Sequence, residues 1–90
     1  MARVVVRLYA SLREAAGVGE CAVDASDVRS VFAELARTQG GLLASELSRI
    51  EADPDRVVVL VNGRNVRPEG WSARLEDGDE VAMFPPVSGG

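Results

Sequence analysis

The sequence predicts a single α+β domain, in which a mixed sheet of four to five strands packs against one main helix. Apolar and polar residues alternate over residues 3–9, as in a half-buried strand. Apolar residues recur with helical spacing over residues 28–36, and strand-like runs cover residues 57–61 and 80–84. One amphipathic helix cannot bury its apolar stripe alone, so we expect it to lie across the sheet. In such an arrangement the first and last strands lie side by side at the centre.

The alternation assigns faces to these two strands. The residues expected to face the helix are Val4, Val6, Leu8, Val81 and Met83. The same parity leaves Tyr9 and Phe84 on the outer face. If the two strands are neighbours, both rings form one exposed aromatic patch at the end of the sheet.

A short helical turn and a second strand are expected between the first strand and the main helix. Ser11 and Glu14 have the spacing of a capping box, and Gly17 ends the turn that they open. Residues 20–24 form the second strand, which pairs with the first as a loose hairpin. Asp27 is the expected N-cap of the main helix, which a Gly-Gly pair then ends.

The second half of the chain supplies the remaining elements. Residues 42–50 carry a weaker helical pattern. Residues 57–61 are apolar throughout, which predicts a strand buried on both faces or nearly so. Asn62-Gly63 predicts a hairpin turn with a short return over residues 65–67. We expect Trp71 to lie in the core.

Composition excludes several classes of function. The chain has no histidine and a single cysteine, Cys21, so we expect no zinc site and no Cys-His or Ser-His-Asp nucleophile. All ten basic residues are arginine, which removes the P-loop lysine and Schiff-base chemistry. A net charge of −4 argues against nucleic acid, and no segment has transmembrane length. The lone cysteine favours a reducing, cytoplasmic location, and its own role stays open.

Carboxylates gather in residues 76–80, around an Asp-Gly pair. They could form an acid/base pair or a metal loop. A solvated turn is the simpler interpretation, because the sequence holds no second cluster of ligands.

The chain ends Phe84-Pro85-Pro86-Val87-Ser88-Gly89-Gly90. The prolines fix φ and favour a stiff, extended path away from the aromatic residue. The terminal glycines have no Cβ, so they can enter a narrow slot of another protein and present a carboxylate. We therefore expect a folded domain over residues 1–84 and a flexible tail over residues 85–90.

Four segments of the chain resemble segments of known proteins, namely residues 8–17, 61–63, 75–81 and 84–90. In this order they resemble the small subunit of molybdopterin synthase and, more broadly, the ubiquitin-like sulfur carriers with a β-grasp fold. Archaeal small modifier proteins share this fold and ending. The thiamine-pathway carriers also end in Gly-Gly, but they are usually shorter and lack the double proline.

The resemblance implies a carrier without catalytic side chains. An E1-like activating enzyme would use ATP to convert the carboxylate of Gly90 to a glycyl-adenylate, and sulfur transfer would then give a thiocarboxylate. The large subunit of molybdopterin synthase would take the tail into its active site. Gly89 has no side chain that would block a narrow entry path. The partner-binding residues that we expect are Tyr9, Phe84, Pro85, Pro86 and Val87.

Two alternatives remain open. The chain could be a ubiquitin-like modifier that joins Gly90 to lysines of target proteins. Because it has no lysine, it cannot form conventional polymers through its own side chains. It could also be a plain interaction domain that is never activated.

Overall fold

The computed structural model describes residues 1–86. Its strands and α-helices, in chain order, are β1 (Ala2–Leu8), α1 (Ala10–Ala16), β2 (Glu20–Ala25), α2 (Val28–Gln39), α3 (Gly41–Ala52), β3 (Val58–Val61), β4 (Arg64–Asn65) and β5 (Glu80–Phe84). Short 3-10 turns cover Pro54–Arg56 and Pro68–Gly70. No helix within these residues is both long and apolar enough to span a bilayer.

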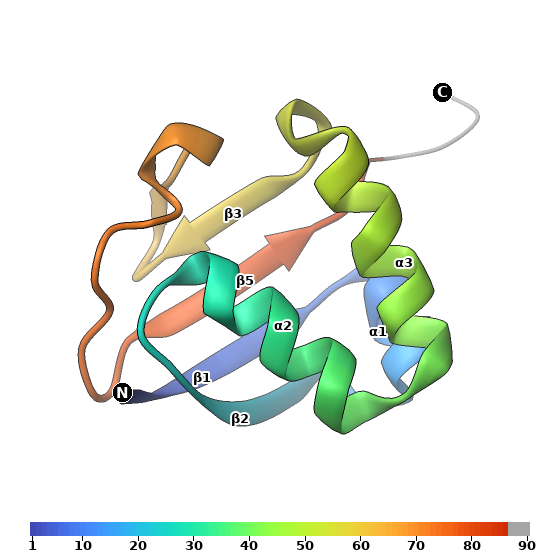
Figure 1. Ribbon diagram of the computed structural model, residues 1–90. Coiled ribbons are helices and arrows are strands. Elements are labelled where there is room, and N and C mark those ends of the chain that lie inside the picture. The colour runs from blue at the N-terminus through green and yellow to red at the C-terminus, as the bar shows by residue number, and fades with distance from the viewer. Residues whose placement is uncertain (87–90) are drawn as a thin grey trace.

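The sheet has the strand order β2-β1-β5-β3-β4. β1 and β5 pair in parallel, whereas β1 with β2, β3 with β5, and β3 with β4 pair in antiparallel fashion. Figure 1 shows α2 crossing one face of this sheet, with α1 and α3 beside it. The predicted mixed sheet with its first and last strands at the centre is thus confirmed, and the arrangement is a β-grasp fold.

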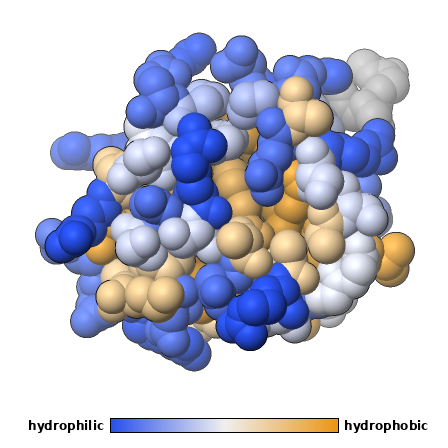
Figure 2. Space-filling view, viewed as in Figure 1, coloured by the Kyte–Doolittle hydropathy of each residue, from blue (hydrophilic) through white to orange (hydrophobic). Residues whose placement is uncertain are grey.

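The main helix, α2, begins and faces the sheet as its sequence predicts. The backbone N–H of Ser30 donates to Asp27 Oδ1 at 2.7 Å, which satisfies a free donor of the first turn. Its buried residues are Val28, Val31, Phe32 and Leu35. On this side of the molecule polar side chains dominate the rim, and apolar ones show between them near the centre (Figure 2). The second long helix, α3, was predicted as a weaker one but equals α2 at 12 residues.

The core lies between α2 and the inner face of the sheet. Val4, Val6, Leu8, Val81 and Met83 are all at most 1% exposed, as their parity predicts. Trp71 is also buried, and its ring meets that of Phe32 edge to face, with centroids 4.9 Å apart. Its Nε1 donates to the carbonyl of Val66 at 3.1 Å, so the polar atom of the buried indole has a partner.

The predicted capping box of the first short helix is wrong. α1 begins at Ala10, with Tyr9 as N-cap and no side-chain cap. The backbone N–H groups of Leu12 and Arg13 both donate to the carbonyl of Tyr9, so the first turn forms around that residue and Ser11 lies inside the helix. The helix end is as predicted, because Gly17 takes the left-handed conformation (φ 77°).

The strand that follows α3 is not buried on both faces. Val58 is 41% exposed, because within residues 1–86 all three helices cover the opposite face of the sheet. The predicted Asn62-Gly63 turn is present, with φ of 51° and 83° at its two residues. Two positive φ values characterise the turn that best fits the twist of a hairpin. The return strand is Arg64–Asn65, which begins one residue earlier and ends two residues earlier than predicted. It begins at Arg64 because this residue pairs with Val61 directly after the two-residue turn.

Candidate functional site

Tyr9 and Phe84 come together at the end of the two central strands. β1 and β5 run in parallel with Leu8 opposite Met83, so the next residue of each strand is at the same level. The two rings stack with centroids 4.3 Å apart and planes at 10°. Tyr9 is 37% exposed and Phe84 is half-buried. A stacked pair contributes about 0.5–1.5 kcal/mol beyond its buried area, which makes this a preformed surface feature.

A third apolar side chain extends this surface. Val58 of β3 lies opposite Phe84 in the sheet and shares its outer face. We call Tyr9, Phe84 and Val58 the aromatic patch. The sequence interpretation missed Val58 because an unbroken aliphatic run does not show which side chains face out. Pairing with β5 would have found it, since Val59 lies opposite the inward Met83.

The rest of the outer face carries apolar side chains, among them Val5, Leu60 and Ala82, together with charged ones. Arg7 contacts Glu80 at 3.1 Å and Glu20 at 3.4 Å, and thereby links three strands. The hydrogen bond to Glu80, helped by both carboxylate charges, raises the pKa of Arg7 above its ordinary value. Arg3 contacts Asp24 at 3.3 Å further along the sheet. These exposed pairs contribute little to stability. The pairs of Arg7 lie nearer the patch, whereas Arg3 lies six residues before Tyr9 along the chain.

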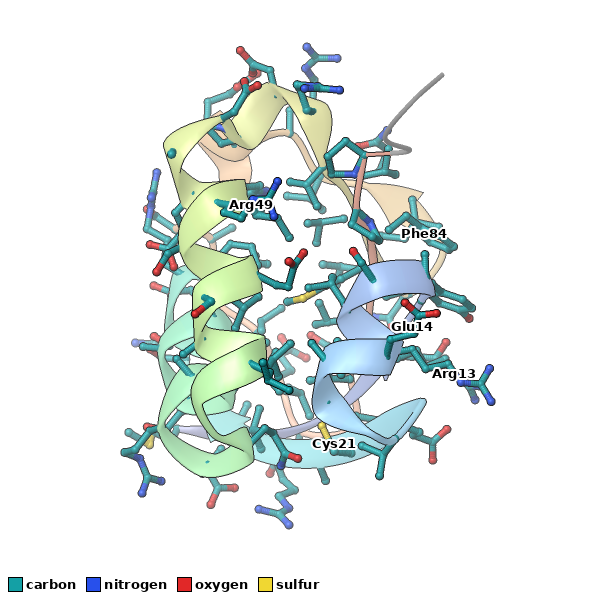
Figure 3. All side chains as sticks on the ribbon, turned by 90° about the vertical axis from the view of Figure 1, so that its right-hand side faces the viewer. Arg13, Glu14, Cys21, Arg49 and Phe84 are labelled. Atoms are coloured by element: carbon teal, nitrogen blue, oxygen red, sulfur yellow. The ribbon has the colours of Figure 1, made fainter. Side chains whose placement is uncertain are left out.

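The two residues after β5, Pro85 and Pro86, form the tail root. Both are half-buried and line a groove of about 440 Å³. The other lining residues are Ser11, Glu46, Arg49, Ile50, Asp53 and Arg56. Figure 3 shows Arg49 on α3 and Phe84 on either side of the strand end that leads to the tail root. The groove and the aromatic patch therefore flank the tail root on opposite sides.

Within residues 1–86, each arginine of the tail-root groove pairs with an acidic neighbour three residues earlier. Arg49 Nη1 lies 3.4 Å from Glu46 Oε1, and Arg56 Nε lies 3.9 Å from Asp53 Oδ2. Their side chains are 79% and 60% exposed. The sequence does not connect these arginines with the tail, because only the folded chain brings α3 and the tail root together. The predicted tail residues Val87, Gly89 and Gly90 lie outside the described part of the chain.

The carboxylates of residues 76–80 organise a turn. Asp79 accepts hydrogen bonds from the backbone N–H of Glu76 at 2.8 Å and from Asn62 Nδ2 at 2.9 Å. These bonds, the backbone one foremost, hold the pKa of Asp79 below its ordinary value. Asp77 accepts from the backbone N–H of Arg3 at 2.8 Å. The contacts fit the interpretation as a turn that ties β5 to β1 and to the hairpin.

Cys21 faces inward on β2, opposite Val6. It is half-buried and packs against the core. Burial raises the pKa of its thiol, so the thiolate that would act as a nucleophile is disfavoured.

Comparison with known proteins finds relatives along nearly the whole chain. A model of the ThiS family matches residues 6–90. The small archaeal modifier protein 3 of Haloferax volcanii is 36% identical over 91 residues, covering 94% of this chain and 96% of the relative. The molybdopterin synthase sulfur carrier subunit of Chlamydomonas reinhardtii is 34% identical over 88 residues, covering 98% and 99%.

Solved structures share the fold. The crystal structure of SAMP1 from Haloferax volcanii superposes with a TM-score of 0.77 at 32% identity and covers 99% of this chain and 100% of that one. A complex of subunits 1 and 2 of the molybdopterin-converting factor from Helicobacter pylori contains a chain that superposes with a TM-score of 0.59. That chain is 22% identical, with coverage of 98% and 99%, so the likeness concerns the fold alone.

Proposed function

The chain belongs to the ThiS family, and on that premise we propose that it carries sulfur on the carboxyl group of Gly90 for molybdopterin biosynthesis. The segment from Phe84 to Gly90 is the main support for this proposal, because the match to the family extends to Gly90. The relative from Chlamydomonas reinhardtii, a molybdopterin synthase sulfur carrier subunit, supports this choice of pathway.

The proposed chemistry needs an activating enzyme and ATP. A carboxylate is a poor electrophile, so an oxygen of the Gly90 carboxylate first attacks the α-phosphorus of ATP and pyrophosphate leaves. Hydrosulfide, released by a sulfur donor, then attacks the carbonyl carbon of the glycyl-adenylate. The bond from that carbon to AMP breaks, AMP leaves, the proton passes to solvent, and a thiocarboxylate remains. Neither step draws on a side chain of this protein. We therefore assign it no catalytic activity of its own, and place it in the cytoplasm with its partners.

Recognition is the role we assign to the folded domain. The aromatic patch would dock on the activating enzyme and on the large subunit of molybdopterin synthase, while the tail root directs the last residues into their active sites. Aromatic side chains that become desolvated at an interface are common centres of binding energy. The similarity to the molybdopterin synthase sulfur carrier subunit of Chlamydomonas reinhardtii supports a synthase partner of this kind.

Conjugation to proteins is the second candidate function. It is favoured by the 36% identity to a small archaeal modifier protein. The same activated Gly90 would then pass to a lysine of a target protein. The two roles share their first step and differ in the acceptor.

Intact mass spectrometry tests both candidates. The full chain is incubated with its activating enzyme, ATP and a sulfur source. A mass gain equal to replacing one oxygen by sulfur is expected for a carrier. High-mass conjugates in cells that vanish when Gly90 is deleted would favour the modifier. A chain whose mass stays unchanged, with no adenylate formed, would contradict both and leave a plain interaction domain.

A further inference from the structure

The cations beside the tail root are arginines, in a chain that has no lysine. Arg49 and Arg56 line the tail-root groove together with Pro85 and Pro86. All ten basic residues of the sequence are arginine. A guanidinium group stays protonated at physiological pH, whereas a very small fraction of lysine amines, with a pKa near 10.4, is neutral there and can attack acyl groups.

The end of the chain can reach this groove. Four residues follow Pro86, and in the extended form they span at most about 14 Å. The two guanidinium groups lie in the groove that the prolines themselves line, and both are largely exposed. A group tethered by so short a linker meets its neighbours at an effective concentration of the order of millimolar.

We propose that Arg49 and Arg56 act as specificity-determining residues, which keep positive charge at the tail root without an amine that could capture the activated carbonyl of Gly90. The inference rests on the proposed function, because only an activated Gly90 is at risk. The reaction that they prevent is intramolecular aminolysis. An amine nitrogen would form a bond to the carbonyl carbon, the bond from that carbon to AMP would break, and the amine proton would pass to solvent. The carrier would close on itself and deliver no sulfur.

The remaining nucleophiles near the tail are weak or distant. Ser11 lines the groove, but the chain has no histidine to activate its hydroxyl group. Cys21 lies on β2, well away from Phe84 and the tail root in Figure 3. Its raised pKa further lowers its reactivity. Ser11 and Cys21 are therefore poor acceptors for the acyl group of an activated Gly90.

A chemical thioester tests the inference without the activating enzyme. The full chain is prepared with Gly90 as the thioester of a small thiol, in the wild type and in Arg49→Lys and Arg56→Lys variants. At about pH 8.5 a small part of the lysine is neutral. We expect at least one lysine variant to lose its thioester about tenfold faster or more than the wild type, as expected for a tethered amine. The product should be lighter by the released thiol, and peptide mapping should join Gly90 to the new lysine.

Arg74→Lys is the matched control. Arg74 is an exposed cation that lines a pocket with Ala2, at the start of β1. The tail leaves beside the end of β1, whose seven residues span about 23 Å back to Ala2, whereas the last four residues span at most about 14 Å, so Gly90 cannot reach this side chain. This variant should therefore behave as the wild type. If both groove variants lose their thioester only by hydrolysis at the wild-type rate, the inference is wrong. That result would leave the proposed function intact, because no enzymatic activation enters this experiment.

Discussion

The inner and outer faces of β1 and β5 carry side chains of different chemistry. On the inner face Leu8 and Met83 are at most 1% exposed beneath the helices. One residue further along each strand, Tyr9 and Phe84 form a stack that stays partly open on the outer face. A shift of one residue thus separates the part of the chain that stabilises the fold from the part available to a partner. We therefore expect that folding and the proposed recognition can be disrupted separately.

The largest effect on stability is expected from the inner face. Leu8→Ala should lower the free energy of unfolding by about 2–5 kcal/mol, because it leaves a cavity in a closed core. Urea denaturation measures this loss. Tyr9→Ala, its neighbour on the outer face, should cost clearly less. Equal losses for both variants would show that the two faces do not differ in this way.

The outer face is expected to matter more for binding. Phe84→Asp should weaken the affinity for the large synthase subunit about tenfold or more, since burying such a ring is worth roughly 1.5–3 kcal/mol. Calorimetric titration measures the affinity. Leu42→Asp is the control, because Leu42 is 74% exposed at the other end of α3 from the groove. A large loss of stability in Phe84→Asp, with affinity unchanged, would assign Phe84 to the core instead.

The smallest effect on stability is expected from the turn of residues 76–80, which leads into β5 and is hydrogen-bonded to β1 and to the hairpin. Asp79 has a lowered pKa, so it stabilises the fold above its unfolded pKa of about 3.9, and this contribution is lost as the pH falls through the folded value. Asp79→Asn should therefore destabilise the protein slightly at pH 7. The difference from the wild type should shrink in acid. Denaturation curves at both pH values measure it, and a constant difference would contradict this role.

The sequence predicts the elements that depend on local pattern. The alternation of apolar and polar residues is enough to place Val4 and Tyr9 on opposite faces of the sheet. Helical spacing of apolar residues locates α2, and Asn62-Gly63 predicts the hairpin. The exposure of Val58 escapes such an analysis, because an aliphatic run looks the same whether one or both faces are covered.

The tail-root groove also escapes sequence analysis. It is formed by α1, α3 and the prolines after β5, which are far apart in the chain. No periodicity indicates that Arg49 will lie beside Pro85. The aromatic stack could be predicted only because the alternation of side chains between the two faces was combined with the expected pairing of the first and last strands.

We propose that the folded domain provides recognition and that Gly90 provides the reacting group. The most direct test compares the wild type with a chain extended by one residue beyond Gly90, in the same activation reaction. Affinity for the activating enzyme and intact mass are measured on both samples. We predict similar melting temperatures and affinities, with the oxygen-to-sulfur mass gain in the wild type alone. An extended chain that gains sulfur as readily as the wild type would contradict the claim.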